Sequence, residues 1–412
     1  MHLIQAFAGL RPAAGRAPEI VAPPYDVLSS DEARDRAAGK PWSFLHISKP
    51  EIDLPPGTDI YSAAVYAKAA ENLQKMIDAG VLVRDAGACY YVYRIIMGKH
   101  VQTGLVAAAS VADYDKNRIK RHELTRPDKE DDRVRQIEAL SAQTGPVLLA
   151  YPKAPAVDAI LKAATTTEPV ADAVADDAIR HTVWAISDEA TIAKLTAEFD
   201  AMHALYIADG HHRSAAASRV AAARKAANPS HTGNESYNYF LSVIFPDHEL
   251  AILDYNRVVT DLNGLSEAQL VERIGAAFSV EKAAAQVKPS KHGEVGMFLK
   301  GQWYRLQVKA ELVPQDPVAR LDVSLLSDHL LTPILGIADL RRDKRIDFVG
   351  GIRGLPELEK RVNSGEMAVA FAMYPTTLAD LMAVADADQI MPPKSTWFEP
   401  KLADGLLSHV IG

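Results

Sequence analysis

The chain has 412 residues, of which 48% are apolar and 24% charged, and this is the composition of a soluble globular protein long enough for two or three domains. Its formal net charge of −8 excludes a generally basic surface and argues against DNA as a partner. The single cysteine, Cys89, excludes an internal disulfide, and the sequence has neither a signal-peptide pattern nor an apolar run of membrane-spanning length, so we expect a cytoplasmic protein with no membrane partner.

The N-terminal region is predicted to hold a stiff loop between short regular elements. The stretch from Ala22 to Asp26 contains two prolines, which fix φ and remove two backbone donors, so it is expected to be non-helical. Such a loop can hold a reactive carboxylate, and Asp26 is a candidate general base. The alternative is a surface turn in which Asp26 bonds to its own backbone. Regular elements are predicted as strands at residues 3–8 and 43–48 and a helix at 61–79.

A charged segment follows a β-hairpin predicted at residues 90–112. From Lys120 to Lys129, several cations, a histidine, a carboxylate and a hydroxyl group occur close together, and residues 130–143 predict a helix. The functional interpretation is a second wall of an active site, in which the basic side chains neutralise phosphate charge and Glu123 is an alternative base or a metal ligand. The alternative is a solvated charged loop.

The middle of the chain alternates predicted strands and helices and ends in a polar turn. The elements expected before the turn are strands at residues 145–151 and 181–186 and helices at 154–164 and 188–200. Leu205 to Ala208 predict a short apolar strand, and the alanine-rich residues 214–227 predict a helix. Gly210 permits a sharp turn between them because it lacks a Cβ.

The polar turn, Asp209 to Arg213, has the residue types of a phosphate-binding site. A helix N-terminus offers free backbone N–H groups and a partial positive charge, and both attract anions. Gly210 lets the backbone approach a ligand, His211, His212 and Arg213 can bind phosphate oxygens, and Asp209 can hold a histidine or a metal ion. The alternative is an ordinary strand–helix connection in which Asp209 caps the helix.

The C-terminal part is predicted to form a second lobe. The expected elements are strands at residues 237–246 and 253–259, a boundary at 261–266, a helix at 266–277, two strands within 294–308, a helix at 322–331, a strand at 367–374 and a helix at 375–387. Prolines make the last block, from Met391 to Phe398, extended, and Lys394 is placed to meet an anion. The alternative is a structural tail.

Four stretches of the sequence resemble one family. The turn around Asp209–Arg213 resembles the core motif of the DUF1015 family, and the segments at residues 21–27, 122–125 and 391–401 match it in the same order across nearly the whole chain. That family is related to the ParB/sulfiredoxin superfamily, which carries a similar Gly-x-His-Arg turn for nucleotide phosphates. The characterised relatives it resembles are kinases of free L-serine that use ADP or ATP to make O-phosphoserine. Their base is a glutamate from an early loop, and Asp26 lies in the early loop here.

The resemblance implies a mixed α/β (α+β) fold. A ParB/sulfiredoxin-like nucleotide-binding core is expected over residues 1–260, and a C-terminal α/β domain, whose tail docks on the core, over 261–412. The implied catalytic residues are Asp26, Glu123 and His122. The implied phosphate-binding residues are Asp209, Gly210, His211, His212, Arg213, Thr125 and Lys394. Mg²⁺ is expected to bridge the phosphate oxygens, with Asp209 as its protein ligand.

These features favour transfer of a phosphoryl group from ADP or ATP to a small hydroxyl-bearing metabolite such as free L-serine. One rival is a non-catalytic nucleotide-binding regulatory protein. Another is a metal-dependent hydrolase built on His122, Glu123, His211 and His212, although the chain lacks the His-Glu-x-x-His spacing. The phosphate donor, the acceptor, the choice of base and the oligomeric state, with a homodimer among the alternatives, stay open.

Overall fold

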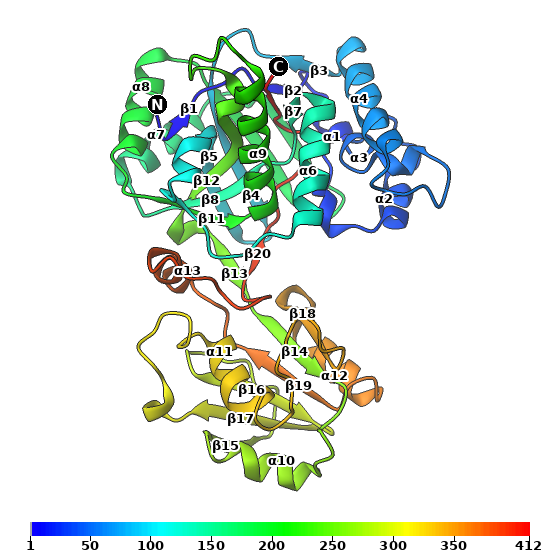
Figure 1. The fold of residues 1–412 in the computed structure, drawn as a ribbon, viewed down its shortest axis with the longest axis vertical. Coiled ribbons are helices and arrows are strands. Elements are labelled where there is room, and N and C mark those ends of the chain that lie inside the picture. The colour runs from blue at the N-terminus through cyan, green and yellow to red at the C-terminus, as the bar shows by residue number, and fades with distance from the viewer. Residues whose placement is uncertain (1) are drawn as a thin grey trace. The chain divides into compact units, whose positions relative to one another are not determined.

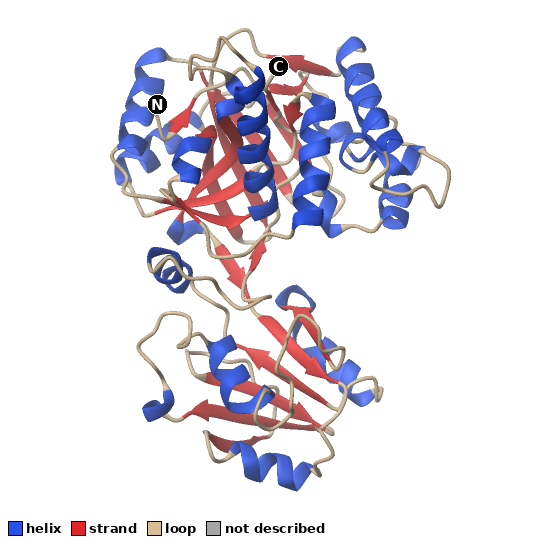
Figure 2. Cartoon of the chain, viewed as in Figure 1, coloured by secondary structure: helices blue, strands red, loops and turns tan. Residues whose placement is uncertain are grey.

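The structure is a computed structural model that describes residues 2–412, and the chain forms two compact units. The first unit contains the chain up to Leu250 together with Pro400–Gly412, and the second contains Ala251–Glu399 (Figure 1). The boundary predicted at residues 260–261 therefore lies inside the second unit. Both units combine helices with sheets, so the protein has the mixed α/β fold that the sequence predicts (Figure 2).

A nine-stranded sheet forms the centre of the first unit. Its strands, in spatial order, are β6 (Ile119–Lys120), β11 (Leu205–Asp209), β8 (Val147–Tyr151), β12 (Tyr239–Pro246), β5 (His100–Ser110), β4 (Tyr90–Met97), β10 (Arg180–Ile186) and β9 (Ala171–Val174), with β1 (Ile4–Gln5) paired to β5. The pairs β11–β6 and β12–β8 are parallel, and the other pairs are antiparallel. All residues of β8 and β12 are buried, as their mainly apolar sequences predict for strands covered on both faces.

Helices pack around this sheet. They are α1 (Ala17–Ile20), α2 (Ser30–Ala37), α3 (Leu45–Ser48), α4 (Ala63–Asp78), α5 (Val111–Asp115), α6 (Pro127–Leu140), α7 (Pro155–Ala164), α8 (Glu189–Asp200) and α9 (His211–Ala227). Figure 1 shows α9 and α6 side by side, and they contact each other along their length. The buried side of α9 joins the same apolar core as the strands, through Ala216, Ala217, Val220 and Ala221. The start of α9 is thereby fixed against the end of β11.

Three predicted elements of the first unit differ from the structure. Residues 43–48, predicted as a strand, contain the short helix α3, in which the Ser48 N–H donates to the Phe44 carbonyl at 2.9 Å. A short apolar run fits a buried helical turn as well as a strand, and here contact with α4 and with the neighbouring 3₁₀ helix at Pro50–Asp53 accompanies the helical form. The strand predicted at 3–8 is limited to β1. The helix predicted at 214–227 begins earlier, at His211.

The second unit is built on a six-stranded antiparallel sheet. Its strands, in spatial order, are β15 (Phe278–Ala283), β17 (Gln302–Val308), β16 (Glu294–Leu299), β19 (Val369–Met373), β14 (Tyr255–Val259) and β18 (Ile346–Gly350). A separate pair joins β13 (Ala251–Leu253) to β20 (Trp397–Glu399). The helices are α10 (Glu267–Ile274), α11 (Asp322–Leu326), α12 (Gly354–Asn363) and α13 (Leu378–Asp386). Across residues 2–412, no helix has the length and apolar character needed to span a membrane.

Candidate functional site

The junction between β11 and α9 is a sharp turn that only glycine fits. Gly210 has φ of 98°, in the left-handed region that disfavours side chains. A Cβ at this position would lie 2.9 Å from Nε and Nη2 of Arg213, so the guanidinium occupies the space that a side chain would need. No side chain caps the first turn of α9. The N-terminal N–H groups of this helix therefore keep their capacity to bind a ligand.

Asp209 ends β11 at a β-bulge, which changes the direction of its side chain relative to the strand. Its Oδ1 accepts a hydrogen bond from the Gly210 N–H at 2.9 Å, while its Oδ2 lies 3.4 Å from Nζ of Lys401 and 3.9 Å from Nη2 of Arg213. Burial alone would raise the pKa of Asp209, but Lys401, Arg213 and His211 outweigh it and lower the pKa to about 2. Asp209 is therefore ionised at neutral pH, as a metal ligand must be.

Arg213 is the fixed positive charge of this junction. Its side chain is only 10% exposed, and its Nη1 lies 3.5 Å from Oδ2 of Asp26, so the structure brings the proline-rich loop to the polar turn. Burial opposes its charge, but Asp26 and Asp209 more than compensate and raise the pKa of the guanidinium. Within the described part of the chain, its Nε has no hydrogen-bond partner. A buried donor without a partner is costly, and a ligand oxygen would satisfy it.

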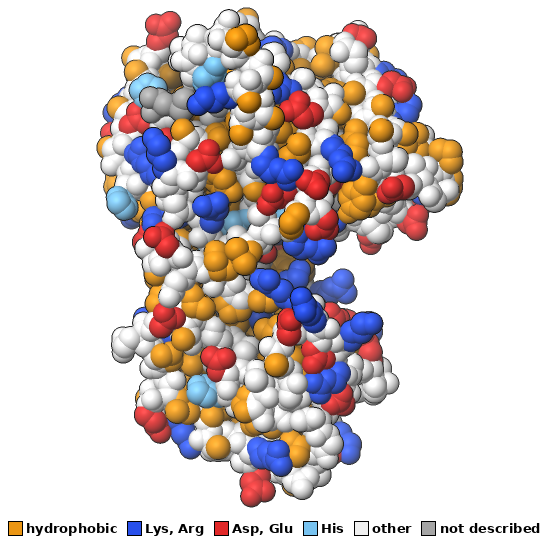
Figure 3. Space-filling view, in the orientation of Figure 1, with side chains coloured by type: hydrophobic (Ala, Val, Ile, Leu, Met, Phe, Trp, Pro, Cys, Tyr) orange, Lys and Arg blue, Asp and Glu red, His pale blue; other side chains and the backbone are white. Residues whose placement is uncertain are grey.

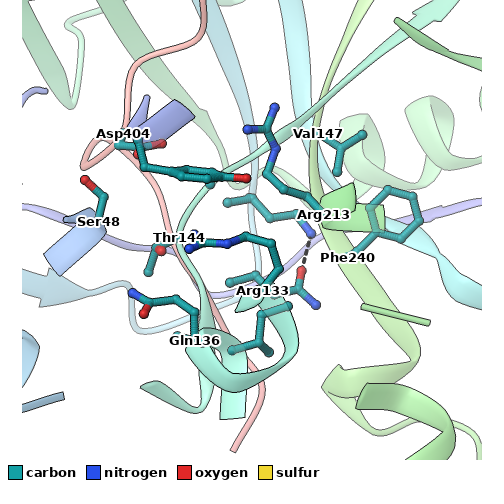
Figure 4. A pocket seen from close by; sticks show the side chains of 14 residues that line it. Ser48, Arg133, Gln136, Thr144, Val147, Arg213, Phe240 and Asp404 are labelled. Atoms are coloured by element: carbon teal, nitrogen blue, oxygen red, sulfur yellow. Dashed lines mark hydrogen bonds between the residues drawn. The ribbon is translucent and has the colours of Figure 1, made fainter. Parts of the chain in front are cut away.

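A pocket that is partly open to solvent adjoins Arg213, with about 470 Å³ of space when the solvent-open part is counted. Arg133, Arg213 and Asp404 are among the side chains that line it, together with Ser48, Gln136 and Thr144 (Figure 4). These residues come from segments far apart in the sequence: α6, α9 and the C-terminal tail. The cavity therefore exists only after the first unit has folded, and its lining carries two guanidinium groups and one carboxyl group.

Tyr25 links the two arginines of the cavity. The guanidinium carbon of Arg133 lies 3.8 Å from the centre of the Tyr25 ring, and that of Arg213 lies 6.0 Å from it. Arg133 is held in turn by Asp132, whose Oδ2 accepts bonds from its Nε and Nη2 at 3.0 and 2.6 Å. Two cations are thus positioned on one aromatic side chain, with Arg133 neutralised by its own carboxylate. Arg133 and Tyr25 are absent from the predicted set of phosphate-binding residues.

Asp404 is a lining residue that the sequence analysis does not identify. It is 2% exposed, and its backbone exchanges hydrogen bonds with Ala22, so the C-terminal tail runs beside the proline-rich loop. Burial raises the pKa of Asp404 to about 7, with Arg213 and Arg133 opposing the rise and Asp26 adding to it. The carboxyl group therefore titrates near neutral pH, in a cavity next to Arg213. An Asp-Gly pair just after the last family-like block is the one local signal in the sequence.

A second polar cluster lies on the histidine side of the same turn. His122 and His211 are buried, with exposures of 2% and 3%, and their rings meet edge to face with centroids 4.5 Å apart. Glu123 is half exposed, and its Oε2 lies 3.7 Å from Nδ1 of His211. Burial lowers the pKa of His122 to about 4 and that of His211 well below its usual value. Both imidazoles are therefore neutral at pH 7, and neither residue is among those lining the cavity described above.

The remaining predicted residues fall into three places. His212 follows His211 but turns to the loop before α6, where its Nε2 accepts a hydrogen bond from the Arg126 N–H at 3.1 Å. Thr125 hydrogen-bonds to Glu130 in the first turn of α6. Lys394 belongs to the second unit, where its ammonium nitrogen lies 5.6 Å from the centre of the Tyr255 ring. The structure thus groups Asp26, Glu123, His122, Asp209, Gly210, His211 and Arg213 around the start of α9.

Charges of both signs are interspersed over the surface of the first unit that Figure 3 shows. Ion pairs account for several of them, such as Arg219 of α9, whose guanidinium contacts Glu130 and Asp131 of α6 at 3.2 and 2.7 Å. This face therefore presents no broad basic patch of the kind that binds a nucleic-acid backbone.

Comparisons with known proteins connect the chain to one family. The model of the family described as "Protein of unknown function (DUF1015)" matches residues 4–324. No curated protein matches the chain. Among solved structures, a free serine kinase variant in complex with AMP is similar at 14% identity and a TM-score of 0.35, over 75% of this chain and 94% of that one.

Two further solved structures match at comparable levels. A conserved hypothetical protein from Pyrococcus furiosus is 15% identical with a TM-score of 0.33, over 76% of this chain and 97% of that one. SbnI with C-terminal truncation from Staphylococcus aureus is 11% identical with a TM-score of 0.37, over 74% and 87% of the two chains. Scores and identities of this size do not assign a function, so the chemistry must be argued from the residues of this chain.

Proposed function

The chain belongs to the DUF1015 family, and on that premise we propose that it is a nucleotide-dependent kinase of free L-serine that yields O-phospho-L-serine. The proposal rests on one observation above all. An uncapped helix begins at a left-handed glycine, next to a largely buried arginine whose Nε has no partner among the described residues. Backbone N–H groups and a guanidinium together form a binding site for phosphate oxygens.

In this proposal the nucleotide phosphates bind at the start of α9. Gly210 allows close approach, and Arg213 contacts the oxygens through its free Nε. Asp209 is ionised and lies beside the turn, so it would hold a Mg²⁺, which would neutralise phosphate charge. Lys401, 3.4 Å from Asp209, adds a second cation to the same place. Phosphoryl transfer requires mainly positioning and charge neutralisation, and these groups supply both.

Asp26 is the base we propose for the acceptor hydroxyl. Its carboxylate lies beside Arg213 at 3.5 Å, whereas Glu123 lies on the other side of the turn, against His211. The serine Oγ would attack the terminal phosphorus and form a new P–O bond. The bond from that phosphorus to the rest of the nucleotide would break, and the hydroxyl proton would pass to Asp26. The pocket lined by Arg133, Arg213 and Asp404 adjoins this junction and is the place we propose for the amino-acid acceptor.

The test is a phosphotransfer assay with the full chain, Mg²⁺, L-serine and either ADP or ATP, in which phosphoserine is measured by mass spectrometry. We expect turnover with at least one nucleotide. Asp26→Asn is expected to lower kcat by about 10²–10⁴-fold while leaving nucleotide affinity within about threefold, as loss of a base does. Glu123→Gln is the matched carboxylate control.

Two outcomes would decide against this proposal. If neither nucleotide binds by calorimetry and no phosphoserine forms, the assignment fails. If nucleotide binds tightly without turnover for serine or other small hydroxyl compounds, the non-catalytic regulatory alternative replaces it. A larger loss of kcat in Glu123→Gln than in Asp26→Asn would keep the kinase but reassign the base.

A further inference from the structure

Buried histidines in this protein fall into two classes. His181 and His409 are 3% and 4% exposed, and each has a ring nitrogen in a hydrogen bond, to the Tyr93 hydroxyl at 2.7 Å and to the Ser236 carbonyl at 3.0 Å. His122 and His211 are equally buried. Within residues 2–412, the Nε2 of His211 has no hydrogen-bond partner, and the ring nitrogens of His122 have none of normal geometry, although the Ile207 backbone is close enough to act on the pKa of His122. The first pair is explained by packing, and the second pair is not.

The unpartnered pair shares its location with a carboxylate. One ring nitrogen from each of His122 and His211 and one carboxylate oxygen of Glu123 all lie within 4.8 Å of one another. His122 and Glu123 come from the loop after β6, and His211 is the first residue of α9, so two separate segments contribute. Glu123 is 52% exposed, and its Oε2 lies 3.7 Å from Nδ1 of His211.

We propose that His122, His211 and Glu123 bind a divalent transition-metal ion of the zinc class. Two imidazoles and one carboxylate form a donor set that zinc and its neighbours accept, with a further position open to water or a ligand. A metal ion would give the unpartnered ring nitrogens the partner that they lack. The inference goes beyond the proposed kinase function, because Mg²⁺ bound to nucleotide phosphates prefers oxygen ligands and needs no histidine.

The spacing of these donors is close to that of a metal site. Ligands held at about 2.0–2.1 Å from a tetrahedral zinc ion lie about 3.4 Å from one another. The Glu123–His211 separation of 3.7 Å already approaches this value, and the widest separation, within 4.8 Å, would have to contract by up to about 1.4 Å. Small shifts of the imidazole rings and of the Glu123 carboxylate would close this gap.

The neighbourhood of the cluster favours a cation. Asp209 lies two residues before His211 and interacts electrostatically with both His122 and His211, so a carboxyl group stands just outside the proposed ligands. Groups of this kind orient metal ligands and strengthen binding. The assignment also separates the two candidate bases, since a metal-bound Glu123 would leave Asp26 as the carboxylate that is free to accept a proton.

The experiment is a metal titration of the full chain after dialysis against a chelator. Zn²⁺ binding is measured by calorimetry, and Co²⁺ binding by its visible absorption, which reports coordination number. We expect one equivalent of Zn²⁺ per chain. Each of His122→Gln, His211→Gln and Glu123→Gln is expected to weaken binding by at least about tenfold. His181→Gln is the matched control, because it removes an equally buried histidine that already has a partner.

Two results would overturn the inference: no stoichiometric uptake of Zn²⁺ or Co²⁺ by the wild type, or uptake that all three variants retain unchanged. Circular dichroism identifies any variant that fails to fold, and Glu123→Gln, at a half-exposed position, remains decisive in that case. The outcome is separable from that of the kinase assay. If the chain makes phosphoserine but takes up no Zn²⁺, only the metal-site inference is wrong. If the chain binds Zn²⁺ but no nucleotide, only the proposed function is wrong.

Discussion

Arg213 of the first unit and Arg257 of the second are both buried cations in ordered structure, yet their surroundings differ in kind. Arg213 interacts with the carboxylates Asp26 and Asp209 and with Asp404, lines a cavity, and has its pKa raised by these neighbours. Arg257 is completely buried on strand β14, and its two terminal nitrogens donate to the backbone carbonyls of Tyr255 and Lys394. Burial lowers the pKa of Arg257 to about 10.

The difference between these arginines shows that burial of a charge does not by itself mark a functional site. The guanidinium of Arg257 joins two segments of the second unit through carbonyl groups, although its Nε, like that of Arg213, has no partner among the described residues. Arg213 is surrounded by ionisable groups whose charges depend on one another, next to a space that a ligand can enter. We therefore expect changes at Arg213 and its neighbours to affect binding and pH dependence, and changes at Arg257 to affect stability.

The largest effect is expected from Arg213→Gln. The substitution keeps polar atoms but removes the positive charge and the fork of donors, so phosphate binding and transfer should fall by about 10²–10³-fold. The loss of transfer is measured as the rate of phosphoserine formation at saturating serine, and the loss of binding as nucleotide affinity by calorimetry. Arg219→Gln is the matched control, because it removes a cation from the same helix that pairs with Glu130 and Asp131 instead. Equal losses of binding and transfer in Arg213→Gln and Arg219→Gln would show that the surroundings of Arg213 give it no special role.

Asp404→Asn tests the coupled charges around Arg213 through pH. The folded-state pKa of Asp404, about 7, lies above that of an unfolded aspartate, so the native state binds the extra proton and stability falls as pH rises through 7. Between pH 5 and pH 8, the free energy of unfolding of the wild type should drop by about 2–3 kcal/mol more than that of the variant. The buried histidines titrate in both proteins, so their contribution cancels when the pH profile of the variant is subtracted from that of the wild type.

Urea unfolding without nucleotide at several pH values measures this difference. Parallel pH profiles for wild type and Asp404→Asn would show that Asp404 is ionised throughout. Asp404 would then be a third negative charge beside Arg213, after Asp26 and Asp209, and phosphate would be a poor ligand for that arginine.

The sequence predicts those parts of the fold that local patterns determine. The mainly apolar runs of β8 and β12 identify buried strands, and the Gly210 turn follows from the need for a residue without a Cβ between a strand and a helix. It fails at residues 43–48, where contacts with distant segments decide between a helical turn and a strand. The family resemblance implies a tail that docks on the core, but no local pattern predicts that Pro400–Gly412 does so through pairing with Ala22, since that contact spans nearly the whole chain.

In the candidate site, too, some features follow from local sequence and others from contacts between distant segments. Adjacent residues of a helix project about 100° apart, so His211 and His212 could not both face one ligand, and the structure places one against His122 and the other against Arg126. That separation is implicit in the helical period once α9 is known to begin at His211, whereas the sequence predicts the helix only from Ser214. The burial of His122 and the position of Asp404 are not implicit in any local pattern, because both depend on packing between segments that are distant in sequence.

Arg257→Gln should act on the second unit, with a smaller effect than the changes at Arg213 and Asp404. A shorter amide cannot reach both carbonyls, so at least one buried acceptor loses its donor, and the free energy of unfolding should fall by about 1–3 kcal/mol. Thermal and urea unfolding measure the loss. Nucleotide affinity of the folded fraction should stay within about threefold of the wild-type value, a small change compared with loss of a binding cation. A loss of affinity as large as that in Arg213→Gln would give Arg257 a role in binding.

Gly210→Ala is the mildest change, and it distinguishes the effect of the turn's backbone conformation from the effect of the position of Arg213. An alanine at φ of 98° is strained, and its Cβ would displace the Arg213 guanidinium from 2.9 Å, so we expect a loss of about 1–2 kcal/mol in stability and roughly a tenfold loss in nucleotide affinity. Gly80→Ala is the control, because that glycine is also in the left-handed region but a Cβ there meets no atom within 4 Å. Backbone strain alone predicts equal losses of stability in the two variants. Only displacement of Arg213 predicts that nucleotide affinity falls in Gly210→Ala and not in Gly80→Ala, which calorimetry on the two folded variants distinguishes.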